Sequence, residues 1–455
     1  MEMILEFLRD VLSQPALLIG IMSCVGLIAL KRPFHKIMTG TLKPILGYLM
    51  LAAGAGVIVS NLDPLGKMIE HGFHITGVVP NNEAIVAVAQ KVLGVETMSI
   101  LVVGLLMNLL IARFTKFKYV FLTGHHSLFM ACLMSAVLGT AGLSGIELIL
   151  VGGFLMGAWS AISPAIGQSY TSKVTDGDEI ALGHFGSLGY YLSAWVAKYV
   201  GKAEESTEDI EIPEKWGFLR DSTLSTALTM IVFYLIAAIA AGSEFVATLS
   251  GSMSPYLFAV MSAMNFAVGV AIVYSGVRMI LGDLIPAFQG IATKIIPNAI
   301  PAVDCAVFFT YAPTAVVLGF ISSFIGGIIG MLILGAVGGV LIIPGLVPHF
   351  FCGATAGIYG NATGGRRGAA VGAFLNGLAI TFLPALALPV LGQLGFQNTT
   401  FGDADFAVMG LVLGNAFEWI GMAGIYGVVV IAALVVIIPN FIKTKGKVIN
   451  YVEEE

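Results

Sequence analysis

Charge is scarce in this sequence, and that scarcity limits what the protein can be. Only 11% of the 455 residues are charged, whereas soluble domains carry about 25%. The 22 basic residues are outnumbered by 27 acidic ones, so the chain offers no basic surface of the kind that nucleic acid requires. We therefore expect neither an ordinary soluble domain nor a nucleic-acid partner.

Motifs for metal binding, nucleophilic catalysis and export are also missing. The 4 cysteines stand singly in apolar runs without a CxxC pair, which is typical of buried packing residues rather than of a zinc site. The sequence contains neither an HExxH nor a GxSxG motif. Its opening, MEMILEFLRDVLSQ, is acidic and lacks the basic segment of a signal peptide. We predict no catalytic residue, no metal and no cofactor.

Apolar sequence, in contrast, is abundant. Hydrophobic residues make up 57% of the chain and the mean hydropathy is +0.94. One globule of this length cannot hide that much apolar surface, so lipid must be the solvent. Lipid offers backbone groups no partners, which favours helices, and the short alternating segments of a barrel are not seen. Apolar runs lie near residues 15–31, 44–62, 97–113, 119–139, 145–166, 181–200, 222–242, 256–278, 304–337, 368–393 and 407–440. At roughly 20 residues a crossing, we predict an all-α integral membrane protein with about eleven transmembrane helices.

Basic segments predict how the chain is oriented in the membrane. KRPFHK at 31–36 follows the first apolar run, and KTKGK at 443–447 follows the last. Because basic loops stay in the cytoplasm, both are expected there, with the N-terminus outside. The RFTKFK segment at 113–118 fits this orientation only if a further crossing lies between 62 and 97.

One loop, at 201–221, is strongly polar and carries a run of acidic residues. We predict that it is an acidic cytoplasmic linker between a first transmembrane half, 1–200, and a second, 222–455. A docking surface for a soluble partner is the alternative interpretation.

Two proline- and glycine-rich stretches, 282–304 and 341–368, interrupt the apolar pattern. Each is apolar enough to enter the membrane but too broken for one straight helix. Non-helical backbone at membrane depth survives only where it faces protein or a wet cavity, and transporters build binding sites from such broken or re-entrant helices. We therefore expect a solute site near these stretches.

Three ionisable residues in apolar surroundings are the first candidates for that site. Asp304 has no lysine or arginine within nine residues, and His125 and His184 each follow a glycine. Intramembrane ionisable residues are functional candidates by default, and imidazole and carboxylate can hydrogen-bond a polyhydroxy solute. The alternatives are a helix cap for Asp304, packing roles for the histidines, a metal site, or a hydrolase.

Several strings of the sequence resemble one family over nearly the whole chain. They are TGHHSLF, SKVTDGDEIALGHFGSLGYY, KAEESTEDIEIP, AIPAVDCAVFFTYAP and LIIPGLVPHFF. The combination is similar to the ascorbate-specific membrane component (IIC) of the bacterial phosphoenolpyruvate-dependent phosphotransferase system. The resemblance implies a homodimer in the inner membrane, with eleven helices per protomer arranged as a substrate-binding core domain and a V-shaped dimerisation domain.

The resemblance also implies a function. Rigid-body movement of the core carries L-ascorbate inward, and a separate IIB protein, itself charged by a IIA protein, phosphorylates it from a phosphocysteine. This chain has no soluble domain with a reactive cysteine, so the phosphoryl donor is expected to be another polypeptide. The family's substrate contacts fall on Asn82, Glu83, His125, His126, Phe129, His184, Phe185 and Asp304, with Ala55 in another lining stretch.

This sequence departs from the family pattern at some of these positions. Some members have glutamines where Phe129 and Phe185 stand, a serine at Ala55, and Thr-Tyr at Asn82 and Glu83. Each lost amide removes hydrogen bonds worth about 0.5–1.5 kcal/mol. We therefore expect the solute to be L-ascorbate or a related sugar acid or pentose derivative, and an ion-gradient-driven symporter of such a solute is the alternative mechanism.

Overall fold

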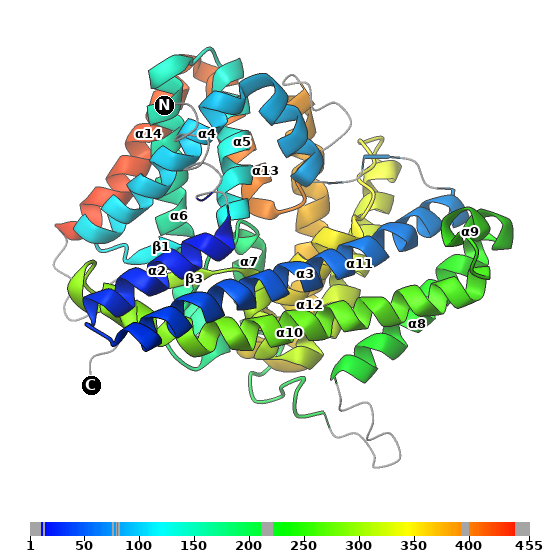
Figure 1. The fold of residues 1–455 in the computed structure, drawn as a ribbon. Coiled ribbons are helices and arrows are strands. Elements are labelled where there is room, and N and C mark those ends of the chain that lie inside the picture. The colour runs from blue at the N-terminus through cyan, green and yellow to red at the C-terminus, as the bar shows by residue number, and fades with distance from the viewer. Residues whose placement is uncertain are drawn as a thin grey trace.

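The computed structural model describes residue 11 and residues 14–74, 77–78, 80, 82–210, 222–392 and 400–441. Its helices are α2 (Pro15–Ala29), α3 (Phe34–Gly72), α4 (Asn82–Phe114), α5 (Gly124–Thr140), α6 (Gly145–Thr175), α7 (Ser187–Val200), α8 (Ser222–Ala241), α9 (Ser243–Ser250), α10 (Pro255–Lys294), α11 (Pro313–Ala336), α12 (Leu346–Gly392), α13 (Ala404–Ile420) and α14 (Met422–Ile437), with 3-10 helices η2 (Cys305–Thr310) and η3 (Ile438–Asn440). The predicted helical fold class is confirmed (Figure 1).

Within the described residues, 7 helices are long and apolar enough to cross a membrane, or up to 8 if the bent pair α8–α9 forms one span. The predicted number of about eleven is not confirmed. One of the 7, α12, folds back on itself at Gly364 and Gly365, whose backbone angles are not helical. Its first leg runs antiparallel to α11 and its second leg parallel to it, so the two legs form an antiparallel pair. The broken stretch predicted at 341–368 contains this bend.

The helices form two groups with separate hydrophobic clusters. One group contains the helices α2, α3, α8 and α10, which lie side by side. The other contains α4, α5, α6, α13 and α14, which lie next to the first group (Figure 1). Small residues let α3 and α10 approach closely: a Cβ added at Gly54 would lie 2.7 Å from the carbonyl oxygen of Gly269. The helix α10 continues through Pro286 to Lys294, so the break expected in 282–304 comes only after Lys294.

Between the groups lies a small parallel sheet that the all-helical prediction did not include. Its strands are β1 (Tyr119–Phe121), β2 (Ala181–Leu182) and β3 (Ile300–Val303), in the order β1-β3-β2. In the register, Phe121 pairs with Ala302, and Leu182 pairs with Val303. Each strand is followed by a helix, namely α5, α7 and η2 respectively. The predicted helical runs at 119–139 and 181–200 therefore begin with extended backbone.

The described part of the acidic loop, 201–210, is held against the helices. The Glu208 carboxylate accepts hydrogen bonds from the backbone N–H groups of Thr314 and Ala315, each at 3.1 Å, and from the Thr314 hydroxyl at 2.9 Å. Beside the bend of α12, Arg366 N–H donates to the Glu205 carbonyl at 2.8 Å. This segment thus anchors the start of α11 and the bend of α12. Residues 211–221 lie outside the described residues, and the division into halves at this loop stays a prediction.

Replacing Glu208 with alanine should destabilise the protein by about 1 kcal/mol, because the first N–H groups of α11 lose their acceptor and the helix dipole loses a negative charge. Thermal unfolding of the detergent-solubilised protein measures the effect. Glu204→Ala removes an exposed glutamate of the same segment and serves as the control. Equal melting temperatures for the two variants would mean that the Glu208 contacts contribute nothing.

Two of the three predicted basic segments lie at one end of the described structure, and the third, at 443–447, lies outside the described residues. Because α3 runs antiparallel to α10, segment 31–36 lies near the end of α10. Lys118 belongs to the same region, since its carbonyl accepts from Ile300 N–H at 2.9 Å. Lys116 N–H donates to the Asn440 side chain at 2.8 Å, which places RFTKFK beside the end of the described chain. Segments 31–36 and 113–118 therefore lie at the same end, and the orientation in the membrane stays a prediction.

Candidate functional site

The predicted site residues converge because parallel strands place their carboxyl ends at one edge, where α/β sheets bind ligands. His125 follows β1, His184 follows β2 and Asp304 follows β3. A glycine is required before His184: a Cβ at Gly183 would lie 2.4 Å from the Ala302 carbonyl oxygen. The Gly183 N–H donates to the Val303 carbonyl at 2.7 Å. The strand pairing thus fixes where the second histidine lies.

Asp304 is both a helix cap and a partner of His125. Its Oδ1 accepts from the Ala306 N–H at 3.2 Å, at the start of η2, and its Oδ2 lies 3.4 Å from His125 Nε2. The other ring nitrogen of His125, Nδ1, lies 3.2 Å from the Tyr48 hydroxyl on α3. The cap and the site role of Asp304 therefore coexist, and this pair links the sheet to the long helices.

His126 and His184 lie with their ring centroids 3.8 Å apart, and each accepts a hydrogen bond from backbone. Phe185 N–H donates to His126 Nδ1 at 3.3 Å, and Gly186 N–H donates to His184 Nδ1 at 3.1 Å. A backbone N–H can only donate, so both rings are neutral and carry their proton on Nε2. Tyr190 Oη lies 2.9 Å from the same His184 Nδ1. Each ring thus offers one N–H donor to a ligand.

A carboxylate that the sequence analysis did not single out, Asp403, completes the polar cluster. It is buried, and its Oδ1 lies 3.9 Å from His184 Nδ1. We do not regard this contact as an ion pair, because Nδ1 of this ring is an acceptor. Asp403 Oδ2 accepts from Asn82 Nδ2 at 2.6 Å, and its Oδ1 accepts from Cys352 Sγ at 2.9 Å. Asp403 immediately precedes α13, where an aspartate ordinarily predicts a helix cap. Its place in the cavity could therefore not be recognised from the sequence.

The cluster lines a cavity of about 1160 Å³, somewhat larger than the range of about 300–1,000 Å³ for ligand sites. The lining includes His125, His126, His184, Asp304 and Asp403. The cavity extends along the second half of α3, the end far from the basic segments, past Asp63, Lys67 and Glu70. The polar groups thus lie deep in the cavity and its other end faces away from those segments.

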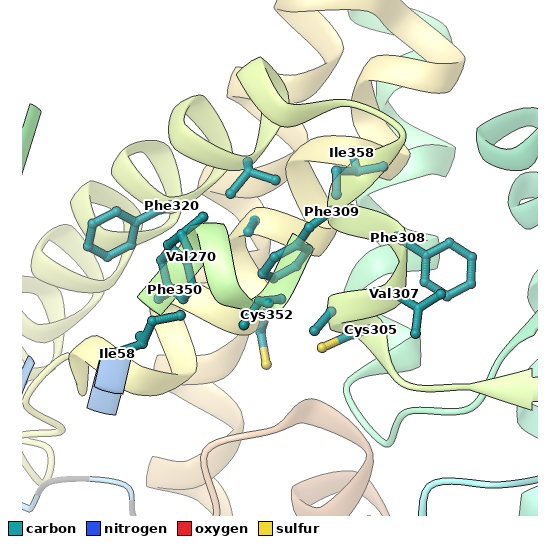
Figure 2. Close-up of a cluster of buried hydrophobic side chains, with 14 of the residues drawn as sticks. Ile58, Val270, Cys305, Val307, Phe308, Phe309, Phe320, Phe350, Cys352 and Ile358 are labelled. Carbon is teal, nitrogen blue, oxygen red and sulfur yellow. The ribbon is translucent and has the colours of Figure 1, made fainter. Parts of the chain in front are cut away.

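Apolar residues build the wall behind the cluster. Figure 2 shows Cys305 and Cys352 at the same edge of a packed group of aromatic side chains, and both cysteines line the cavity. Within that group the ring of Phe350 lies 5.8 Å from Phe309 and 5.6 Å from Phe320, edge to face. Such close packing holds η2 against α11 and α12 and keeps Asp304 in place.

The other predicted residues differ in their placement. Phe129, Asn82 and Ala55 line the cavity. Phe185 is fully buried and stacks on Phe121 at 4.6 Å, so its backbone rather than its ring serves the site. Glu83 belongs to α4, but its side chain lies outside the described residues.

Two sets of buried side chains are close enough to hold a metal ion, namely His126, His184 and Asp403, and His184, Asp304 and Cys305. Both sets need His184. Histidine ligands normally donate their second ring N–H to an acceptor, whereas His184 Nδ1 receives the N–H of Gly186. This geometry favours a hydrogen-bond donor to a solute over a metal ligand.

Long apolar helices define the class, a multi-pass helical membrane protein. A buried polar cluster at the ends of three strands, facing a cavity, is the arrangement in which transporters bind solutes. The comparison with known families gives the particular one. The model of the family described as PTS system sugar-specific permease component, EIIC-GAT, matches residues 10–405. The chain belongs to this family of the phosphotransferase system (PTS), and it is a multi-pass protein of the bacterial inner membrane.

A curated relative supports the same family. The ascorbate-specific PTS system EIIC component of Mycoplasma pneumoniae is 26% identical over 417 residues, which cover 78% of this chain. The chain spans 62% of the length of that relative. The resemblance predicted from the sequence is thus confirmed at the level of the family.

Proposed function

We propose that the protein carries L-ascorbate, or a sugar acid or pentose derivative of similar size, across the inner membrane as a homodimer, and that a separate IIB protein, charged by IIA, phosphorylates the solute. The observation that carries this proposal is the convergence of His184, His126 and Asp304 on one deep cavity. Neutral N–H donors beside carboxylate acceptors match a ring of hydroxyl groups. The relative's ascorbate specificity supports the choice of first solute.

The direction of transport follows from the orientation. The basic segments mark the cytoplasmic side, and the cavity extends along the half of α3 that is farthest from them. In this state the site therefore faces outward, which is the orientation in which a permease binds a solute for uptake. Our candidate for the moving core is the helix group that contains α5 and α6, together with the three strands and the helices that follow them. The long helices are our candidate for the dimerising domain.

We expect His184→Ala to weaken L-ascorbate binding by about tenfold or more, because the solute loses a buried N–H donor. Calorimetric titration of the purified protein in lipid nanodiscs measures this, with a thermal melt to confirm folding. His35→Ala, at an exposed histidine near the start of α3, is the matched control. Unchanged affinity in a folded His184→Ala variant would contradict the assignment.

A gradient-driven symporter is the second candidate, and the 3.4 Å contact of His125 with Asp304 favours it as a proton relay. Membrane vesicles separate the two mechanisms. We expect uptake to continue when a protonophore collapses the gradient while phosphoenolpyruvate and the soluble phosphotransferase proteins are supplied. Uptake that stops under these conditions would support the symporter instead.

A further inference from the structure

We propose that the cavity recognises an uncharged polyhydroxy solute, so that it takes up a lactone, polyol or pentose derivative, or the protonated form of a sugar acid, in preference to an anion. This inference rests on the proposed function and narrows its solute. Asp403, the neutral state of the two buried histidines, and the partners of the other charges carry it.

Asp403 is a buried carboxylate whose two oxygens both accept hydrogen bonds, and it has no cationic partner among the contacts described for it. Its oxygens accept from the Asn82 amide at 2.6 Å and from the Cys352 thiol at 2.9 Å. The nearest imidazole, His184, accepts a backbone N–H on Nδ1 and is therefore neutral. Asp304 has His125 beside it at 3.4 Å, whereas among the described residues the one ion-pair candidate of Asp403 is the His184 ring, at 3.9 Å. The floor of the cavity thus presents a carboxylate that no described cation pairs with.

The rest of the described lining does not offset this charge. Lys67 lines the cavity but is bound to Asp63 at 2.8 Å, and both side chains are exposed. Glu70, one turn further along α3, adds another carboxylate. An anion entering the cavity would therefore meet carboxylates both on its path and at its floor.

Helix N-termini often bind anions, and two of those near the cluster already hold carboxylates of the protein itself. Asp304 Oδ1 accepts from Ala306 N–H at the start of η2, and Asp405 Oδ1 accepts from Leu188 N–H at the start of α7. Asp403 stands directly before α13 but does not accept a hydrogen bond from its first N–H groups. At the starts of η2 and α7, the N–H groups that these carboxylates occupy are thus not free for an anionic ligand.

The same groups suit hydroxyls well. His126 and His184 each offer one N–H, and the carboxylates of Asp304 and Asp403 accept. A neutral polyol both donates and accepts at each hydroxyl, so it can satisfy all four side chains. For an anionic solute, a negative charge about 5 Å from a carboxylate is repelled enough, at a protein dielectric near 20, to weaken binding by on the order of a hundredfold.

The test compares two probes of similar size by calorimetric titration of the full-length protein in nanodiscs. L-ascorbate is an anion at neutral pH, and L-gulono-1,4-lactone is uncharged. We expect the lactone to bind tighter than ascorbate near pH 7.5. Between about pH 7.5 and pH 5.5, ascorbate affinity should rise by up to about a hundredfold as its protonated fraction grows, while lactone affinity stays nearly constant.

A variant tests independently whether removing the carboxylate charge strengthens or weakens ascorbate binding. Asp403→Asn keeps the shape of the side chain and removes the charge, so ascorbate binding near pH 7.5 should tighten by about tenfold or more while lactone binding does not improve. Asp283→Asn, a carboxylate paired with Lys43 outside the cavity, is the control and should change neither probe. A melting curve confirms folding, and the wild-type comparison stands even if Asp403→Asn does not fold.

Two outcomes would overturn the inference. Tighter binding of ascorbate than of the lactone near pH 7.5, with affinity that falls on acidification, would overturn the inference alone and leave the proposed function intact. Failure of both probes to bind would overturn the proposed function together with it.

Discussion

Gly183→Ala is expected to weaken solute binding by about a hundredfold, the largest binding effect of any single change proposed for this protein. The added Cβ would lie 2.4 Å from the carbonyl oxygen of Ala302 and 2.6 Å from its carbon. Both atoms belong to the backbone of β3, which cannot turn away as a side chain would. The strand β2 must therefore separate from β3, and His184 moves with it. Displacing a site group by about 1 Å can cost a hundredfold.

Titration with L-ascorbate and with L-gulono-1,4-lactone measures this loss, and Gly177→Ala is the matched control. Gly177 lies in the loop before β2, where an added Cβ meets nothing within 4 Å. Wild-type affinity for both probes in Gly183→Ala, with the same melting temperature, would show that the strand contact does not position His184.

The largest stability effect is expected for Asp405→Ala. Asp405 is fully buried and accepts hydrogen bonds from Ser187 Oγ at 2.7 Å, Leu188 N–H at 2.9 Å and Trp159 Nε1 at 3.2 Å. Truncation leaves these donors without an acceptor, at about 1–3 kcal/mol each before the structure relaxes. We expect a net loss of about 3–5 kcal/mol, because one carboxylate joins α6, the start of α7 and the start of α13.

Thermal unfolding in detergent provides the measurement, and the melting temperature should fall by on the order of 5 °C or more. Asp405→Asn retains an acceptor oxygen and should fall between wild type and the alanine variant. Asp283→Ala removes a partly exposed partner of Lys43 and should change stability by less than about 1 kcal/mol. If Asp405→Ala melts like Asp283→Ala, the buried contacts are not what holds these helices together.

The helices and the main site residues could be predicted from the sequence because a lipid environment constrains both the backbone and any ionisable side chain. Long apolar runs must satisfy their own backbone groups, and a charge such as Asp304 in such a run must have partners. The structure places Asp304 beside His125, and His184 on the same cavity. The solute contacts of these residues stay a prediction.

The sheet could not be predicted, because its strands are too short to have a pattern. Tyr119–Phe121 and Ala181–Leu182 are apolar segments that read equally well as the start of a helix. Their pairing with Ile300–Val303 depends on contacts between distant parts of the chain. The local preference of a segment for strand or helix does not indicate which distant segment it pairs with.

Asp403 and the bend of α12 show a second limit. An aspartate before a helix is so common as a cap that its sequence gives no sign of Asn82, which lies 321 positions away. Proline drew attention to the 341–368 stretch, yet the chain turns at Gly364 and Gly365, where glycine supplies the positive φ of +59° at the second position. The helix α10, conversely, accommodates Pro286 without ending.

The central claim is that three strand ends bring His125, His184 and Asp304 to the floor of one solute cavity. A cryo-electron microscopy map of the protein in nanodiscs, with saturating L-gulono-1,4-lactone and separately with L-ascorbate, tests it most directly. We expect ligand density within about 3 Å of His184 Nε2 and of an Asp304 oxygen. Density elsewhere in the membrane region, with these side chains arranged as they are without ligand, would contradict it.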